Sequence, residues 1–207
     1  RGRSRARARS AGITALDVGL YDALAVGSIV KGGTSVALAY TRGSNMLHIT
    51  LDRTYAAGEL IDLGVSYSGT PPTVGYGSFT FRTHGSPPEP IVSSLSEPTY
   101  APTWWPCIDD PSDKAIVEVN LNVPGGLVGV SNGLLAATIA NPDGTTTYQW
   151  RSAYPISTYL VSVAISNYAT WTETYNPVAG GPAMPVQHWV YPEHLAAAQQ
   201  DLSVTVP

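Results

Sequence analysis

Residues 115–123 have the sequence AIVEVNLNV, and this stretch decides the fold class. Valine or leucine occupies positions 117, 119, 121 and 123, while glutamate or asparagine occupies 118, 120 and 122. Side chains of an extended strand point alternately to its two faces, so this period of two predicts a strand with one buried face. The Pro124-Gly125-Gly126 sequence that follows predicts a turn, which ends the strand.

The same pattern recurs in both directions from this strand. Asn141-Pro142-Asp143-Gly144 is a strong turn signal and is expected to join residues 134–140 to residues 145–152 as a hairpin. Further strands are predicted over residues 25–30, 35–40, 46–51, 60–67, 78–82, 160–167 and 186–191. We therefore expect an all-β fold, an antiparallel sandwich or saddle-like domain built from several sheets.

Only the last segment of the chain has a helical pattern. Pro192 suits the first helical position, and Glu193 complements the helix dipole. The residues that share one helical face are Leu195, Ala198, Gln199 and Leu202. Gly180-Gly181-Pro182 resembles a linker, so we expect a β domain over residues 1–185. Residues 186–207 are then expected to form a linker strand and a short helix that begins the next domain.

Arginine alternates with small residues from Arg1 to Arg9. An edge strand with arginines on its solvent face and a disordered basic arm both fit this pattern. The whole chain has a net charge of −4, which argues against a nucleic-acid partner. No run approaches the roughly 18 apolar residues of a membrane span.

The composition is that of a globular protein. Apolar residues make up 43% of the 207 residues and charged residues 13%, so a sizeable core is expected and extensive disorder is not. The single cysteine, Cys107, excludes an intrachain disulfide. The cellular location stays open, with secretion or the periplasm favoured over the cytoplasm.

Residues 97–115, EPTYAPTWWPCIDDPSDKA, form the most informative segment. This segment resembles the N-terminal domain of the aminopeptidase N family of zinc metallopeptidases. That domain has Glu-Pro-Thr-x-Ala-Arg, an aromatic residue, Pro-Cys, and Asp-Glu/Asp-Pro-Ser-x-Lys-Ala at the same spacing. Residues 47–51, 58–71, 130–133 and 154–161 are similar to other segments of the family. The resemblance covers nearly the whole chain and implies that the first strand of the domain precedes it.

Glu97 is the residue to which the resemblance gives a function. In the family, a glutamate at this position contacts the α-ammonium group of the substrate, and a desolvated carboxylate beside that cation favours free amino termini. The alternative is a solvated loop carboxylate. Pro98 disfavours helical geometry at Glu97. Leu95 replaces a substrate-contacting glutamine and Pro102 replaces an arginine, so neither of those family contacts is expected.

The remaining motif residues are expected to be structural. Trp104, Trp105 and Cys107 should pack under the loop, and Pro106 belongs to the same structural motif. Cys107 is expected to be an unreactive thiol because no histidine lies near it in sequence. The acidic residues lack the glycine and terminal glutamate of a calcium loop. Instead, Asp109 and Ser112 are expected to bond loop amides, Asp110-Pro111 to form a turn, and Lys114 to pair locally.

The zinc motif His-Glu-x-x-His of this family is absent, because His48, His84, His188 and His194 never have that spacing. The resemblance implies that this chain binds no cofactor. It also implies that the parent enzyme contains zinc and removes amino-terminal residues from peptides. This domain would cap the active-site cleft, and the peptide substrate would be bound with an absent catalytic domain. The alternatives are a β-sandwich binding module, for example for carbohydrate, and a structural domain of an inactive homologue.

Overall fold

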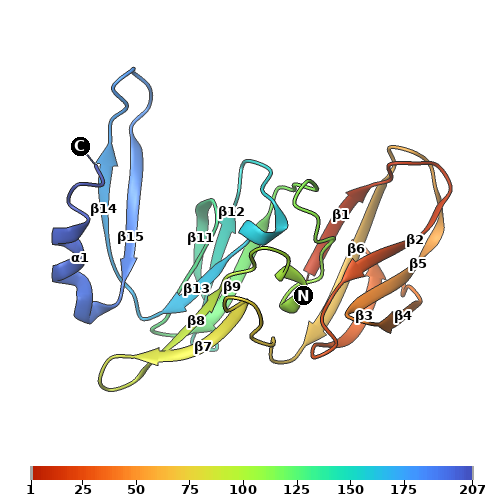
Figure 1. Cartoon of the computed structure of the whole chain (residues 1–207), viewed down its shortest axis with the longest axis horizontal. Helices are drawn as coiled ribbons and strands as arrows, with labels where there is room; N and C mark the ends of the chain where they lie inside the picture. The colour runs from red at the N-terminus through yellow and green to blue at the C-terminus, as the bar shows by residue number, and fades with distance from the viewer. Residues whose placement is uncertain (1, 207) are drawn as a thin grey trace. The chain divides into compact units, whose positions relative to one another are not determined.

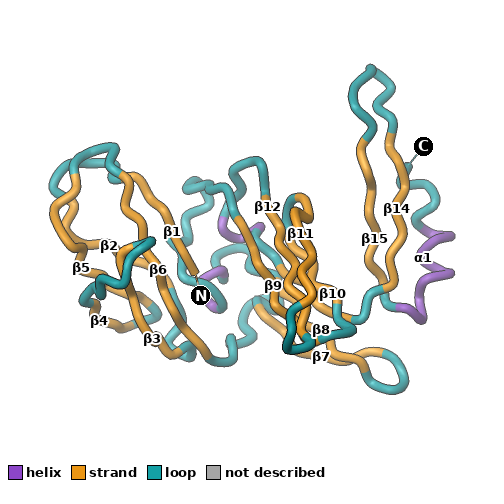
Figure 2. The backbone as a smooth tube through the Cα atoms, turned by 180° about the vertical axis from the view of Figure 1, so that it is seen from behind, coloured by secondary structure: helices purple, strands orange, loops and turns teal. Residues whose placement is uncertain are grey.

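The computed structural model describes residues 2–206. The fold is all-β, as predicted, because strands make up 49% of the chain and one short helix lies near the C-terminus. Figure 2 shows this predominance of strands. Each strand pairing within the described residues is antiparallel. These residues form two compact units, of which the first contains residues up to 80, 94–117 and 152–162.

Two three-stranded sheets build most of the first unit, in the strand orders β1-β6-β3 and β2-β5-β4 (Figure 1). The first sheet contains β1 (Gly2–Arg7), β6 (Leu60–Ser68) and β3 (Ala25–Lys31). The second contains β2 (Ile13–Gly19), β5 (Met46–Tyr55) and β4 (Tyr40–Gly43).

The hydrophobic core of the first unit comes from alternate residues of its central strands. Leu47, Ile49 and Leu51 of β5 are buried, and so are Ile61 and Leu63 of β6. Each such side chain stabilises the fold by roughly 1.5–3 kcal/mol when fully buried. The period of two in the sequence therefore corresponds directly to the buried faces of these strands.

The second unit contains three sheets, in the orders β10-β13-β8-β7, β11-β12-β9 and β14-β15. The first is formed by β10 (Val128–Ser131), β13 (Val163–Ser166), β8 (Glu89–Ser94) and β7 (Phe79–His84). The others are formed by β11 (Leu134–Ala140), β12 (Thr145–Arg151), β9 (Glu118–Pro124), β14 (Ala169–Tyr175) and β15 (Met184–Val190).

The hairpin expected around Asn141 is confirmed. β11 and β12 pair antiparallel, and the amide of Asn141 donates a hydrogen bond of 2.9 Å to the carbonyl of Thr145. On the neighbouring strand β9, Val123 is buried and the polar positions 118, 120 and 122 are exposed. The helix expected from Pro192 is also confirmed, as a 3₁₀ turn (Pro192–His194) followed by α1 (Leu195–Asp201). No helix within residues 2–206 is long and apolar enough to cross a membrane.

Two predicted strands differ from the structure. Residues 35–39 do not form a continuous strand, because a tight turn follows β3: the amide of Lys31 donates to the carbonyl of Val36, and Ala37 forms an isolated bridge to Val30. Tyr40 begins β4. The strand predicted from residue 160 begins at Val163, since Thr158–Leu160 form a 3₁₀ turn. Strands β2, β4, β8, β10 and β14 were not predicted from the sequence.

Within the arginine run, Gly2–Arg7 form strand β1, the edge of its sheet, which confirms the strand interpretation for these residues; Arg9 follows the strand, and Arg1 lies outside the described residues. Arg5 is exposed and forms an ion pair of 3.1 Å with Asp62 of the neighbouring strand β6. At the other end of the chain, Gly180-Gly181-Pro182 lies in the loop of the β14–β15 hairpin, whose last residue pair is Tyr175 with Met184.

Candidate functional site

Glu97 lies on an exposed turn that follows β8. The backbone amide of Tyr100 donates a hydrogen bond of 2.8 Å to the carbonyl of Ser96 and closes this turn. Ser96 is buried, whereas Glu97, Pro98 and Thr99 are exposed at the tip. The turn therefore has a fixed base and a solvated tip.

Among residues 2 and 5–206, whose side chains the structure describes, none forms a hydrogen bond or ion pair with the Glu97 carboxylate. Other glutamates of the chain are paired, such as the half-buried Glu59 with Arg53 at 2.9 Å and the exposed Glu118 with Arg151 at 3.4 Å. The oxygen lone pairs of Glu97 are thus available to an incoming cation.

The residues after the turn are buried. Ala101 and Thr103 belong to a 3₁₀ turn (Ala101–Thr103) and are fully buried, and Thr103 Oγ1 donates a hydrogen bond of 2.7 Å to the carbonyl of Tyr100. Pro102 lies in the first turn of this segment, where its missing N–H is not required. Its carbonyl accepts a hydrogen bond of 2.9 Å from the amide of Tyr21. A buried proline therefore occupies the position at which the family usually has an arginine.

The two adjacent tryptophans differ in their hydrogen bonding. Trp104 Nε1 donates a hydrogen bond of 3.0 Å to Ser96 Oγ. Trp105 Nε1 is buried and has no partner within the described residues. Sequence reasoning treated both residues as packing only, and no sequence signal distinguishes them.

Cys107 lies in a backbone bridge with Gly19. The amide of each residue donates to the carbonyl of the other, at 3.1 and 2.8 Å. Burial raises the pKa of the Cys107 thiol well above its ordinary value, and the nearby Asp109 carboxylate adds to this effect. Pro106 is also fully buried. Both residues stabilise the loop, and the thiol is kept protonated.

The acidic residues of the motif fix the loop to a second segment. Asp109 accepts a hydrogen bond of 2.6 Å from Thr158 Oγ1, and the carbonyl of Pro111 accepts one of 2.7 Å from Ser157 Oγ. Burial raises the pKa of Asp109, although the Thr158 bond opposes this shift. These contacts explain why residues 158–160 form a turn instead of a strand.

Two expectations for this motif were wrong. Ser112 does not bond a loop amide; its amide and hydroxyl both donate to Asp110 Oδ1, each at 2.8 Å. These bonds hold the pKa of Asp110 below its ordinary value. Lys114 has no ion pair within residues 2–206, so the local pairing expected for it is not observed.

A sequence model of the Peptidase M1 N-terminal domain matches residues 20–160. The chain belongs to this family. The matched range includes the whole Glu97 turn and its supporting residues. The M1 N-terminal domain assignment agrees with the resemblance inferred from the motif at residues 97–115.

Relatives of this M1 domain are aminopeptidases. Human glutamyl aminopeptidase is 27% identical over 132 residues, which are 64% of this chain and 13% of the relative. Leucine aminopeptidase 2 from Vanderwaltozyma polyspora is 33% identical over 76 residues, or 37% of this chain and 11% of the relative. The M1 zinc metallopeptidase from Deinococcus radiodurans has the same fold, with a TM-score of 0.78 and 20% identity over 97% of this chain and 47% of that structure. The chain thus spans less than half the length of these proteins.

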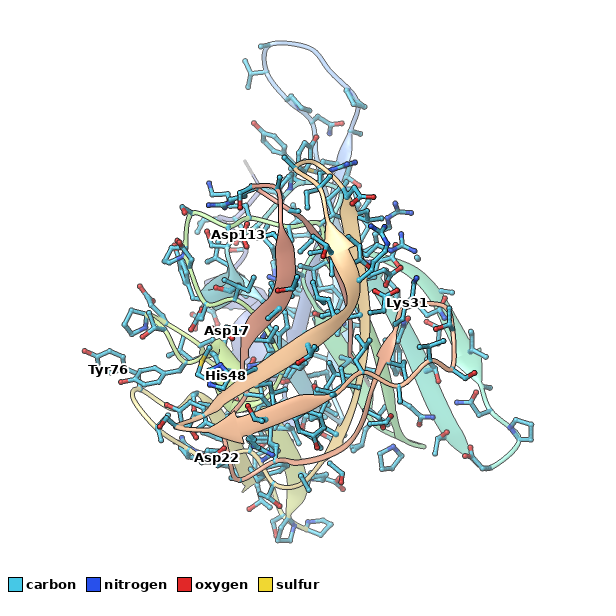
Figure 3. The ribbon with its side chains drawn as sticks, turned by 90° about the vertical axis from the view of Figure 1, so that its right-hand side faces the viewer. Asp17, Asp22, Lys31, His48, Tyr76 and Asp113 are labelled. Atoms are coloured by element: carbon cyan, nitrogen blue, oxygen red, sulfur yellow. The ribbon has the colours of Figure 1, made fainter. Side chains whose placement is uncertain are left out.

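The histidines of this M1 domain have separate partners. His48 Nδ1 lies 2.8 Å from Asp17 Oδ1 (Figure 3), and His188 Nε2 lies 2.8 Å from Glu173 Oε2. Within residues 2–206, no group of three or more His, Cys, Asp or Glu side chains is arranged to hold a metal ion.

His84 lies between a serine and a glutamate, an arrangement that resembles a hydrolase triad. His84 Nε2 is 2.9 Å from Ser166 Oγ, and His84 Nδ1 is 2.7 Å from Glu193 Oε1. However, Ser166 is fully buried and its hydroxyl donates to the carbonyl of Pro90 at 2.8 Å. A nucleophile must reach its substrate, so this network is structural and joins the turn at Pro192–His194 to β7 and β13. This network could not be predicted from the sequence, because its residues are 82 and 109 positions apart.

Proposed function

We propose that the chain is the non-catalytic N-terminal domain of a zinc-dependent aminopeptidase that removes amino-terminal residues from peptides. In this proposal the domain caps one end of the active-site cleft and supplies Glu97 to bind the α-ammonium group of the substrate. Family membership supports the aminopeptidase context. The unpaired Glu97 carboxylate on its fixed turn is the observation that carries the assignment of this residue.

The physical argument starts from the state before substrate binds. A carboxylate that is already paired would have to lose its partner before it bound an ammonium group, and this exchange would weaken the gain. Glu97 has no such partner within the described residues, so its oxygens are available for a charge-assisted hydrogen bond. A free amino terminus carries a positive α-ammonium group, whereas an amino group within a peptide bond is an uncharged amide. A carboxylate that binds the α-ammonium group therefore selects the end of a peptide, as an exopeptidase must.

Zinc belongs to the parent enzyme in this proposal. In the described part of this chain no three His, Cys, Asp or Glu side chains are arranged to hold a metal ion, and the contribution proposed for this chain is to bind and orient the substrate. The metal would polarise the scissile carbonyl and activate water. We expect the purified chain alone to hold no stoichiometric zinc by elemental analysis and to release nothing from aminoacyl substrates.

The test is substitution of Glu97 in the full-length enzyme. Glu97→Ala removes one buried ion pair with the substrate, and truncation of such a pair costs about 2–5 kcal/mol. This corresponds to a fall in kcat/KM on the order of 30-fold to several thousand-fold. Glu97→Gln is expected to lose less, because its amide oxygen still accepts a hydrogen bond from the ammonium group.

Glu118→Ala is the matched control. Glu118 is an exposed glutamate of the same chain, but it pairs with Arg151 across β9 and β12. This variant should keep the kcat/KM of the parent, and all three variants should keep its zinc content. Unchanged kcat/KM in both Glu97 variants would show that Glu97 is only a surface residue.

The carbohydrate-binding alternative requires several exposed aromatic side chains in a row on one sheet face. Four phenylalanine or tyrosine residues within the described part of the chain are exposed, namely Tyr40, Tyr76, Phe81 and Tyr154. Tyr40 lies on β4 and Phe81 on β7, while the other two lie in separate loops. Tyr76 projects alone into solvent (Figure 3). This distribution does not favour a sugar platform.

A further inference from the structure

A side-chain hydrogen bond holds Ser96 at the base of the Glu97 turn. Trp104 Nε1 donates to Ser96 Oγ at 3.0 Å, and Ser96 immediately precedes Glu97. Ser96 is only 1% exposed, so water does not compete effectively for its hydroxyl. The same residue accepts the Tyr100 amide through its carbonyl, which means that Ser96 is fixed by both its side chain and its backbone.

The Trp104 indole is itself fixed. Its backbone carbonyl accepts a hydrogen bond of 3.0 Å from the Tyr67 hydroxyl, and its backbone amide donates to the carbonyl of Ala101 at 3.2 Å. Its ring packs against Phe79, with 5.7 Å between the ring centroids. Tyr67 belongs to β6, the central strand of its sheet. A continuous set of contacts therefore runs from a central strand to the residue before Glu97.

We propose that Trp104 is a positioning residue for Glu97. By holding Ser96 in place, its indole N–H fixes the backbone from which the Glu97 side chain reaches the substrate ammonium group. This inference rests on the proposed function of Glu97 and adds a residue that acts through it. Misplacement of a binding group by about 1 Å can cost on the order of 100-fold in rate, so loss of this anchor should be measurable as lower activity.

The neighbouring tryptophan provides a matched control. Trp104→Phe and Trp105→Phe each replace an indole by a smaller ring, but only Trp104→Phe removes a hydrogen bond, because Trp105 Nε1 has no partner within the described residues. Ser96→Ala removes the acceptor of the same bond with little change in volume. It serves as a second variant in case Trp104→Phe does not fold.

The experiment measures kcat/KM of the full-length enzyme for each variant, both with Glu97 present and in the Glu97→Ala background. With Glu97 present, Trp104→Phe and Ser96→Ala should lower kcat/KM about 10-fold to 100-fold. In the Glu97→Ala background they should lower it less than about 2-fold, because the group they position is absent. Trp105→Phe should have the same effect in both backgrounds.

The outcomes separate this inference from the proposed function. If Glu97→Ala lowers kcat/KM but Trp104→Phe and Ser96→Ala have equal effects with and without Glu97, the positioning role is overturned and the function of Glu97 stands. If Trp104→Phe and Ser96→Ala leave kcat/KM unchanged with Glu97 present, the positioning role is likewise overturned. If Glu97→Ala itself leaves kcat/KM unchanged, the proposed function fails, and the positioning role fails with it.

Discussion

The hydroxyl of Tyr67 donates a hydrogen bond of 3.0 Å to the backbone carbonyl of Trp104. This bond connects the central strand β6 to the loop that carries Glu97. Burial raises the pKa of Tyr67 to about 12, with a smaller contribution from Cys107. The neutral hydroxyl is therefore the form that the fold requires.

Tyr67→Phe should destabilise the chain by about 1–2 kcal/mol, because the Trp104 carbonyl loses a donor in a half-buried place. The pKa of Tyr67 is higher in the folded state than the ordinary value of 10.0. The contribution of the neutral Tyr67 hydroxyl to the free energy of unfolding is thus fully present below pH 10 and is lost as the pH rises towards 12. Urea unfolding at neutral and alkaline pH measures both effects. The difference between wild type and Tyr67→Phe should shrink in alkali, and a constant difference would contradict this account.

Gly75→Ala should destabilise the first unit by roughly 1–3 kcal/mol. Gly75 has a φ of +57°, and a Cβ at this position would lie 2.2 Å from Cε2 of Tyr100. The backbone amide of Tyr100 closes the Glu97 turn, so a shift of this residue that relieves the clash would disturb that turn. Gly43→Ala is the control, since no atom lies within 4 Å of its added Cβ. Thermal unfolding should show a lower Tm for Gly75→Ala only; equal Tm values would mean that the Tyr100 ring moves freely.

Thr158→Val should destabilise the chain more at neutral pH than in acid. Thr158 Oγ1 donates to Asp109, and this bond favours the ionised carboxylate, whose pKa burial has already raised. A raised pKa in the folded state means that stability is lost as the pH increases through that pKa. Removal of the Thr158 hydroxyl raises the pKa of Asp109 further. The free energy of unfolding at pH 7 should therefore fall by about 1–3 kcal/mol relative to wild type. Thr158→Ser keeps the hydroxyl and should behave like wild type in the same denaturant titrations. An equal loss at both pH values would exclude ionised Asp109 as the cause.

Cys107 should resist alkylation in the folded chain. Its thiol is buried and its pKa is raised, so very little thiolate exists at neutral pH. Iodoacetamide labelling followed by mass spectrometry should show slow modification in buffer and rapid modification in urea. Rapid labelling without denaturant would show that the loop opens locally.

The strands that were predicted correctly carry their own signal in the sequence. The alternation over residues 117–123 and the Asn141 turn depend on neighbouring residues only, and both appear in the structure. β2, in contrast, contains Asp17 and is a strand because it pairs with β5, about thirty residues later in the chain. β10 has four residues and pairs with β13 in the same way. Such strands depend on partners that local patterns do not reveal.

The candidate site was predictable in part. The motif identified Glu97 as the candidate residue. The hydrogen bond from the Ser112 amide to Asp110 was also predictable, because an aspartate in a turn commonly accepts a hydrogen bond from the backbone amide two residues later. The bond between Trp104 and Ser96 was not predictable, because it depends on how the chain folds back over eight residues. The same holds for Thr158, which is 49 residues from Asp109.

The edge strands β1 and β11 differ in their protection against aggregation. β1 presents exposed arginines, including Arg5 and Arg7, and charge on an edge strand opposes pairing with another chain. β11 has no charged residue, and Leu134, Leu135 and Ile139 are exposed along it. A concentrated solution of the isolated chain should therefore lose solubility first through β11. Thr138→Lys would give that edge the protection that β1 already has.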